Sequence, residues 1–267
     1  MEIQLWREIL EPYSLAVDEL LIKFNHVQRA FQKANDYCPI ELVQGRVKTI
    51  ASILEKANRK HIPLDTLEDQ MGDIAGIRLI CPFVEDCYAV AELIRRRTDM
   101  EIVSEDDYIA RPKESGYRSF HIQIRYTVQT LREPKTIYAE IQIRTLGMNC
   151  WSTIEHSLQY KYRGNVPEEL SLRLQHTADG MIATDQELSS IRDEIQAAKV
   201  MQAEEDRIVG DILVTIQNLY KLASRREAVR MQEEFFRIYQ EQNLDKLKHF
   251  ATELDIIAEG YRAQSLV

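Results

Sequence analysis

Basic side chains are concentrated in one short segment, Gln44 to Lys60, which carries five positive charges and one negative charge. On a helix over 47–60, four polar residues would lie within about 80° of one another, at about 100° per residue. These are Lys48, Ser52, Lys56 and Arg59, and Arg46 stands just before the helix. The opposite side is apolar, with Ile50, Ile53, Leu54 and Ala57. Such a row could bind the phosphates of a nucleotide near the helix N-terminus, or it could face solvent.

Two carboxylates are placed where a divalent cation could bind. In the alternating segment 136–145, Glu140 shares one face with Tyr138, Gln142 and Arg144, and Asp73 comes just before an apolar segment that contains Arg78. In the alternating segment 119–126, one face carries His121, Gln123 and Arg125. Two carboxylates from adjacent strands can hold Mg²⁺ through oxygen ligands, with substrate phosphates completing the shell. The alternative is an ordinary salt bridge between Glu140 and Arg144 or Arg78.

A third cluster lies in the segment Lys113 to His121, which contains Gly116 and Tyr117. A glycine before an aromatic residue allows the backbone to approach a ligand closely, and tyrosine offers a face on which a base can stack. A single Gly-Tyr pair is weak by itself.

Hydrophobic periodicity indicates the elements that must position these residues. Helices are predicted over 2–34 with an interruption near Pro12, and over 47–60, 85–97 and 146–162, the last ending at Gly164. Strands are predicted over 74–81, 119–126 and 136–145, and the last two are expected to be antiparallel neighbours. Everything after Pro167 is predicted to be helical. There Leu174, Met181, Leu188 and Ile195 form a heptad-like series, which suits either packing within the domain or an oligomer contact.

Composition limits the class of protein. The 267 residues carry 34 basic and 43 acidic side chains, a net charge of −9, and 45% are hydrophobic. This is enough apolar material for a sizeable core, whereas a net acidic chain is a poor candidate for duplex DNA binding. The four cysteines show no zinc-type spacing, and neither a signal peptide nor a run of about 18 apolar residues is visible. We therefore expect a soluble cytoplasmic protein with reduced thiols and no membrane or duplex DNA partner.

Several motifs occur together in one order: GRVK (45–48) with SILEK (52–56), DIAGIR (73–78), KESGYRSFH (113–121), EIQIRT (140–145) and WSTIEHSLQYKY (151–162). In this order they resemble the synthetase domain of the RelA/SpoT family, specifically the single-domain small alarmone synthetases of the RelQ type. The resemblance covers about residues 1–205. It implies an α+β fold with a nucleotidyltransferase-like mixed β-sheet flanked by helices, and it leaves residues 206–267 as an additional helical C-terminal extension.

The resemblance also implies an activity. The family transfers the β,γ-pyrophosphoryl group of ATP to the ribose 3′-OH of GDP or GTP, which yields the alarmones ppGpp or pppGpp of the stringent response. Mg²⁺ is the implied cofactor. The hydrolase domain of the long family members has no room in this chain, so synthesis without hydrolysis is expected.

Matching the family's motifs residue by residue implies the following roles. Arg46 and Arg78 would sandwich adenine, while Lys48, Ser52, Lys56 and Arg59 would bind the rest of ATP. Asp73 and Glu140 would hold Mg²⁺, and Glu140 would also orient or deprotonate the acceptor 3′-OH. Tyr117 would stack on guanine with Asn149 reading its edge. Lys113, His121, Gln142 and Arg144 would complete the site for GDP or GTP.

Two alternatives stay open at this point. The first keeps the chemistry but changes the acceptor to the 3′ end of tRNA or an adenine nucleotide, and the presence of Tyr117 and Asn149 favours a free guanine nucleotide instead. The second is a tetrameric regulatory module that binds single-stranded RNA, and the presence of Asp73 and Glu140 argues against it. The resemblance further implies a homotetramer.

Overall fold

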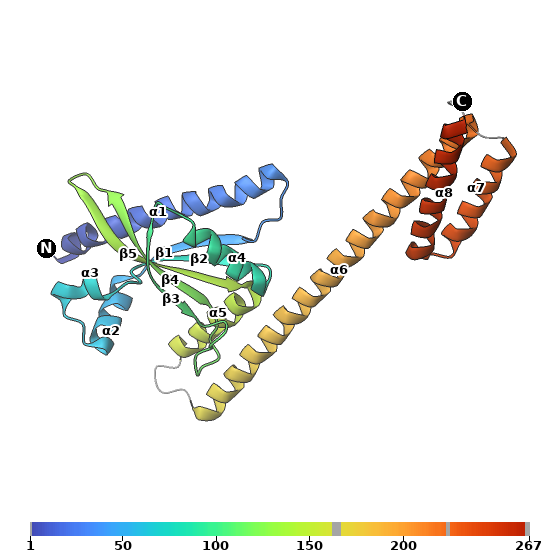
Figure 1. Cartoon of the computed structure of the whole chain (residues 1–267). Coiled ribbons are helices and arrows are strands. Elements are labelled where there is room, and N and C mark those ends of the chain that lie inside the picture. Colours follow the sequence, from blue (N-terminus) through green and yellow to red (C-terminus); the bar gives the residue numbers. More distant parts are fainter. Residues whose placement is uncertain (1, 162–166, 223–224, 265–267) are drawn as a thin grey trace. The chain divides into compact units, whose positions relative to one another are not determined.

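The computed structural model describes residues 2–161, 167–222 and 225–264, and its first part is built around a five-stranded mixed sheet (Figure 1). The strands are β1 (Leu42–Val47), β2 (Ala75–Cys81), β3 (Glu101–Asp107), β4 (Phe120–Gln129) and β5 (Pro134–Thr145), in the spatial order β1-β2-β5-β4-β3. β2 and β5 pair in parallel, and the other pairs are antiparallel. The predicted α+β class and the antiparallel pairing of β4 with β5 are therefore confirmed.

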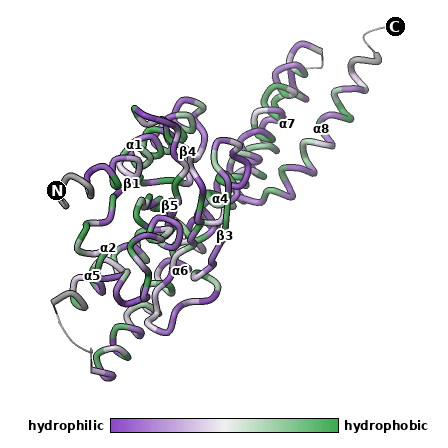
Figure 2. The backbone as a smooth tube through the Cα atoms, turned by 90° about the vertical axis from the view of Figure 1, so that its left-hand side faces the viewer, coloured by the Kyte–Doolittle hydropathy of each residue, from purple (hydrophilic) through white to green (hydrophobic). Residues whose placement is uncertain are grey.

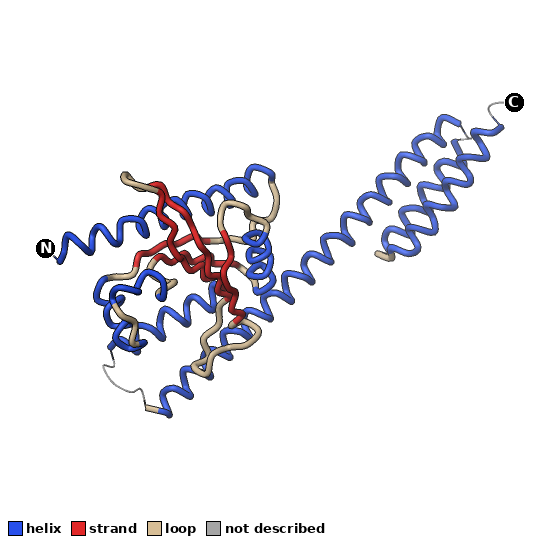
Figure 3. The backbone as a smooth tube through the Cα atoms, turned by 60° about the vertical axis from the view of Figure 1, so that its left-hand side comes forward, coloured by secondary structure: helices blue, strands red, loops and turns tan. Residues whose placement is uncertain are grey.

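One face of this sheet is the hydrophobic core. Successive side chains of a strand point to opposite faces, so the residues on one face of β2, β4 and β5 are nearly all apolar and buried, among them Ile77, Ile122 and Ile141. The alternation is visible along the backbone in Figure 2. The helices α1 (Glu2–Ala34) and α4 (Val84–Arg95) pack on this core together with α2 (Ile50–Lys60) and α3 (Leu67–Gln70), and the short turn η1 (Leu64–Thr66) leads into α3 (Figure 3). The opposite face carries polar side chains.

The structure corrects three predictions about the elements. α1 is continuous through Pro12, because Pro12 lies on its buried side beside Tyr13 and Ala16, and their packing offsets the hydrogen bond that proline removes. The helix predicted over 47–60 begins at Ile50, since Thr49 caps its N-terminus, and the residues before it form β1. β3 was not predicted at all. The predicted end of α5 (Leu146–Lys161) at Gly164 lies outside the described residues.

The later helices are α6 (Glu168–Leu222), α7 (Arg225–Gln240) and α8 (Leu244–Gln264), which confirms the prediction of helical structure for the described residues after Pro167. The chain divides into two units, residues 1–189 and 190–267, and the division falls inside α6. The second unit has its own core at helical spacing, which includes Ile212 on α6, Phe235 on α7 and Leu254 on α8. Among the described residues, none of the helices combines the length and the apolarity that crossing a membrane requires.

Candidate active site

The polar face of the sheet brings the predicted site residues into register. Glu140 on β5 lies between Gly76 on β2 and Gln123 on β4, while Gln142 lies between Arg78 and His121. The edge strand β1 extends these rows by placing Arg46 beside Gly76. Four strands thus supply one continuous polar surface, whose members range in sequence from Arg46 to Gln142.

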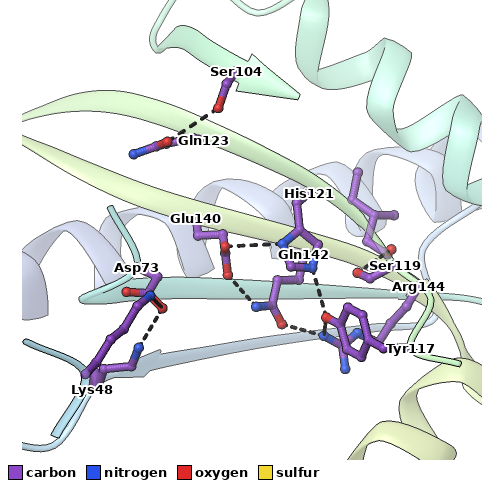
Figure 4. A network of polar contacts seen from close by, with 12 residues as sticks. Lys48, Asp73, Ser104, Tyr117, Ser119, His121, Gln123, Glu140, Gln142 and Arg144 are labelled. Carbon is purple, nitrogen blue, oxygen red and sulfur yellow. Dashed lines mark hydrogen bonds and ion pairs between the residues drawn. The ribbon is translucent and has the colours of Figure 1, made fainter. Parts of the chain in front are cut away.

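A cluster of opposite charges lies at one end of this surface. Asp73, just before β2, accepts hydrogen bonds through Oδ2 from Lys48 Nζ at 2.6 Å and Lys56 Nζ at 2.5 Å (Figure 4). Burial alone would raise the pKa of Asp73, but the hydrogen bonds from the two lysines hold the pKa below its ordinary value. Burial lowers the pKa of Lys48 despite its contact with Asp73. The cluster has two cations and one ionised carboxylate, so it carries a net positive charge.

The other residues predicted for the ATP side are Ser52, Arg59, Arg46 and Arg78. Ser52 and Arg59 are exposed on α2, and the Ser52 hydroxyl accepts a hydrogen bond from Thr49 Oγ1 at 2.9 Å. Arg46 and Arg78 line a cavity of about 360 Å³ at the β1 edge, together with Leu21, Val43, Gln44, Gly45 and Gly76. Since Gly76 has no side chain, the floor between the two arginines is open to a flat ligand.

A chain of hydrogen bonds connects Glu140 to the segment before β4. Glu140 contacts His121 Nδ1 at 3.2 Å, and His121 Nε2 contacts the Tyr117 hydroxyl at 2.8 Å (Figure 4). Arg144 Nη2 donates to the same hydroxyl at 2.8 Å. One protonation pattern satisfies the whole chain: Arg144 donates to Tyr117, Tyr117 donates to Nε2, and a neutral His121 donates from Nδ1 to Glu140.

Gln142 closes this network into a ring. Its amide nitrogen donates to Glu140, and its carbonyl oxygen accepts from Arg144. Burial by itself would raise the pKa of Glu140, but the hydrogen bonds from His121 and Gln142 keep the pKa below its ordinary value. Glu140 is therefore ionised at neutral pH, which suits a ligand for a cation better than a strong general base.

Arg144 is the most buried member of the ring, with 1% of its surface exposed. Its three hydrogen bonds go to neutral side chains: Tyr117, Gln142 and Ser152. Burial lowers its pKa. In this arrangement Arg144 holds Tyr117 and Gln142 in place and contributes positive potential to the surface above it.

Lys113 lies against two aromatic rings at the outer side of the network. Its Nζ is 4.3 Å from the ring centre of Tyr108 and 5.0 Å from that of Tyr117. Tyr108 also meets His121 edge to face, at 5.2 Å between ring centres. These distances are typical of cation–π and aromatic pairs. Lys113 therefore has a defined position over the two rings, and a base that stacks on Tyr117 would displace it.

Buried polar atoms without a hydrogen-bond partner gather at the same residues. Within the described residues there are five, and four of them belong to residues predicted for the site: Asp73 Oδ1, Arg78 Nε, Arg144 Nε and Asn149 Oδ1. The fifth is Nε of Arg118, next to Tyr117. Leaving a buried polar atom unpaired costs about 1–3 kcal/mol, so such a concentration indicates a surface made to bind polar ligand groups.

Sequence reasoning missed several residues of this surface. Tyr108 contacts Lys113, Ser152 accepts a hydrogen bond from Arg144, and Gln123 lies beside Glu140. Gln123 also fills the space above Gly72, where an added Cβ would come within 1.8 Å of its Nε2. Only the position of Gln123 on the same strand face as His121 could have indicated it. Ser152 follows Asn149 by three residues, which places both on one side of α5.

Comparison with known proteins places the chain in a family. Residues 45–165 match the family model described as the region found in RelA/SpoT proteins. The GTP pyrophosphokinase YjbM of Bacillus subtilis is 49% identical over 199 residues, which are 74% of this chain and 94% of that protein.

Solved structures agree with this assignment. The crystal structure of small alarmone synthetase 1 from Bacillus subtilis bound to its product pppGpp superposes with a TM-score of 0.70 at 50% identity, covering 72% of this chain and 99% of that one. A GTP pyrophosphokinase family protein from Streptococcus pneumoniae gives a TM-score of 0.69 at 49% identity, covering 73% and 97%. The identity, the coverage and the shared fold together show that the chain belongs to the RelA/SpoT family and groups with its small alarmone synthetases.

Proposed function

We propose that this protein transfers the β,γ-pyrophosphoryl group of ATP to the 3′-OH of GDP or GTP. The observation that carries the proposal is the polar face of the sheet. It holds a net positive cluster at Asp73 and a separate aromatic half around Tyr117, and Glu140 lies on the strand between them. Such a surface fits a reaction that needs two nucleotides held side by side.

The cluster around Asp73 is the proposed ATP side. Lys48, Lys56 and Arg59 would bind the phosphates with Ser52, and Arg46 and Arg78 would stack on adenine from the cavity that they line. Lys48 and Lys56 both contact Asp73 in the structure. Phosphate oxygens offer these lysines stronger acceptors, so nucleotide binding would free the carboxylate.

The aromatic half is the proposed acceptor side. Tyr117 would stack on guanine after Lys113 leaves its ring, and Lys113 could then reach the acceptor phosphates together with His121 and Arg144. Asn149 would read the edge of the base with its unpaired Oδ1, and Gln142 would orient Glu140 toward the ribose.

The residues present fit a magnesium ion. Asp73 keeps one buried oxygen without a partner among the described residues, and Glu140 is held ionised. In the described part of the chain, no cluster of three or more Asp, Glu, His or Cys side chains could hold a metal ion by itself. Two carboxylates plus substrate phosphates are a usual ligand set for Mg²⁺. When bound, the cation would neutralise charge that develops on the transferred group.

The chain's own residues would supply positioning and charge. The acceptor 3′-oxygen forms a bond to the β-phosphorus of ATP, and the bond from that phosphorus to the oxygen bridging to the α-phosphorus breaks, which releases AMP. The 3′-OH proton passes to Glu140 or to solvent. The step needs no covalent enzyme intermediate, so a site of cations, carboxylates and an aromatic platform is sufficient.

The test is label transfer from γ-labelled ATP in the presence of Mg²⁺, with GDP, GTP, GMP, tRNA or no acceptor in separate reactions. We expect labelled ppGpp from GDP and labelled pppGpp from GTP, and no transfer after a chelator removes the metal. Label on tRNA or on an adenine nucleotide would mean that this molecule, and not GDP or GTP, is the acceptor. No transfer by folded protein would overturn the proposal. In a separate reaction, the protein incubated with labelled ppGpp should release no pyrophosphate, because we expect synthesis without hydrolysis.

A further inference from the structure

The first turns of α6 pack against the elements of the proposed acceptor side. Ala178 lies so close to Gly116 that an added Cβ there would approach to 2.7 Å, and Gly116 has a φ of +87° that favours glycine. Asp179 pairs with Arg118 at 3.2 Å. These contacts attach α6 to both sides of Tyr117 in the sequence.

The same helix also contacts α5. Trp151 Nε1 donates to Leu174 O and Thr177 Oγ1, each at 3.0 Å. The contact positions on α6 recur every three or four residues from Leu174 onward, so they share one face of the helix. About two turns beyond Ala178, this face carries Asp185.

Asp185 is a buried carboxylate at the junction of β5 and α5. Asp185 is only 5% exposed, and its Oδ2 accepts a hydrogen bond from Thr145 Oγ1. Thr145 is fully buried, and the same hydroxyl accepts from Met148 N at 3.0 Å, as an N-cap residue does. Burial raises the pKa of Asp185. The carboxylate therefore fixes the threonine that begins α5.

Gly147 shows how closely Asp185 approaches α5. An added Cβ at Gly147 would come within 2.8 Å of Asp185 Oδ1 and 3.0 Å of Oδ2. The carboxylate of Asp185 thus contacts the first turn of α5 directly, in a space that only glycine leaves free.

The junction is adjacent to the groups that face the acceptor. Thr145 follows Arg144 directly, and α5 carries both Asn149 and Ser152, the hydrogen-bond partner of Arg144. The proposed ATP side is built elsewhere, from β1, α2 and the residues before β2. A shift of the β5–α5 junction would therefore move acceptor groups and leave the lysine cluster in place.

We propose that Asp185 is a positioning residue for the acceptor half of the site, and that it acts through Thr145 on Arg144 and Asn149. The inference rests on the proposed function for the identity of the acceptor. It assigns a role to α6 that the chemistry itself does not require. It also predicts an effect on one substrate only.

The test compares binding of GDP with binding of a non-hydrolysable ATP analogue to the full chain, by titration calorimetry. We expect Asp185→Ala to weaken GDP binding about five- to tenfold, the effect of one lost buried hydrogen bond, and to change ATP-analogue binding less than about twofold. Asp185→Asn keeps an acceptor for Thr145 and should restore most of the GDP affinity. In label transfer, the KM for GDP should rise more than kcat falls.

Two further variants guard against misinterpretation. Ser189→Ala is the matched control, since Ser189 is also 5% exposed on α6 but bonds to Glu85 on α4, and it should leave both affinities unchanged. Gly147→Ala should weaken GDP binding by pushing the carboxylate away, and it should still fold, because the gain in helix propensity offsets part of the overpacking cost of about 1–3 kcal/mol. It remains informative if Asp185→Ala does not fold.

The outcomes separate the two proposals. GDP affinity unchanged in Asp185→Ala and in Gly147→Ala, or an equal loss for both nucleotides, overturns the positioning role. Wild-type protein that binds GDP but transfers no label overturns the proposed function while the binding comparison still decides the role of Asp185. Wild-type protein that binds no guanine nucleotide overturns both.

Discussion

Asp73 combines two demands at the scale of single residues. Its Oδ2 accepts hydrogen bonds from both Lys48 and Lys56, and its unpaired Oδ1 is proposed to meet the metal. We predict that Asp73→Asn lowers the rate of pyrophosphate transfer by at least about a hundredfold, since removing one group that stabilises transition-state charge typically costs that much. Label transfer measures the rate, and thermal unfolding shows whether the variant is folded.

Asp69→Asn is the matched control for this prediction, because Asp69 is an exposed acid on α3 near the same segment. It should keep the wild-type rate. A wild-type rate in Asp73→Asn with Mg²⁺ present would mean that Asp73 is not a metal ligand.

The pKa values of Asp73 and Asp185 are shifted in opposite directions, so the two residues should make the free energy of unfolding depend on pH in opposite ways. Lysine hydrogen bonds outweigh burial and hold the folded-state pKa of Asp73 below 3.8, so its contribution is present above that pH and is lost as the pH falls through the lowered value. Burial raises the pKa of Asp185 above 3.8, so its contribution is present below that pH and is lost as the pH rises through the raised value.

The expected result concerns the free energy of unfolding relative to wild type, from about pH 3 to about pH 7. Over this range Asp73→Asn should lose stability relative to wild type, and Asp185→Asn should gain it. Urea unfolding at several pH values measures both differences. Parallel pH profiles for the two variants would contradict the assignment of opposite shifts.

At the scale of elements, the sequence predicted the strands that have a buried face and missed those that do not. β2, β4 and β5 each bury every second residue, which produces the apolar alternation. β1 and β3 are the two edge strands, and most of their residues are exposed. Edge strands carry charges freely, so their sequence shows little periodicity.

The site followed the same division. Alternation along the sequence placed Glu140, Gln142 and Arg144 on one face of the sheet. Only the strand register shows that Gln142 has Arg78 as its neighbour on β2 and His121 as its neighbour on β4. Tyr108, Ser152 and Asp185 reach the site from other elements through tertiary contacts, which no local pattern encodes. The proposed roles of these residues stay predictions until they are tested.

Packing of β1 on α1 provides a prediction at the element scale. An added Cβ at Gly45 would come within 2.7 Å of Val17 Cγ1 and 3.0 Å of Leu21 Cγ, whereas at Gly76 its nearest neighbour would be 3.9 Å away. Gly45→Ala should therefore destabilise the chain by about 1–3 kcal/mol through overpacking. Since β1 also carries Arg46, the variant should bind the ATP analogue more weakly.

Gly76→Ala is the control for stability, because its added methyl group meets only ordinary contacts. Denaturant unfolding of both variants measures the difference. Equal stability of Gly45→Ala and wild type would show that β1 can move off α1 without cost.

At the scale of the whole molecule, the homotetramer implied by the family is a prediction about assembly. On α6, Leu188 is 48% exposed and Ile195 is 51% exposed, so part of the heptad-like series is available for contact. Light scattering coupled to gel filtration should give four times the chain mass of 31.2 kDa. A monomer mass would restrict the heptad-like series to packing within the chain.

Residues 206–267, which are most of the second unit, are expected to be dispensable for catalysis. The residues proposed to contact the nucleotides or the metal lie between 46 and 149, the family model ends at residue 165, and the alignments with relatives leave about a quarter of this chain uncovered. The second unit also has a separate hydrophobic core, so removing it does not open the core beneath the sheet.

A chain ending at residue 205 keeps Asp185 and every α6 contact with the acceptor side. We predict that its rate of pyrophosphate transfer stays within about twofold of the full chain, a change of less than about 0.5 kcal/mol in the activation barrier. A folded truncated chain with a much lower rate would mean that residues 206–267 support catalysis, and comparing its light-scattering mass with that of the full chain would show whether they do so by holding copies together.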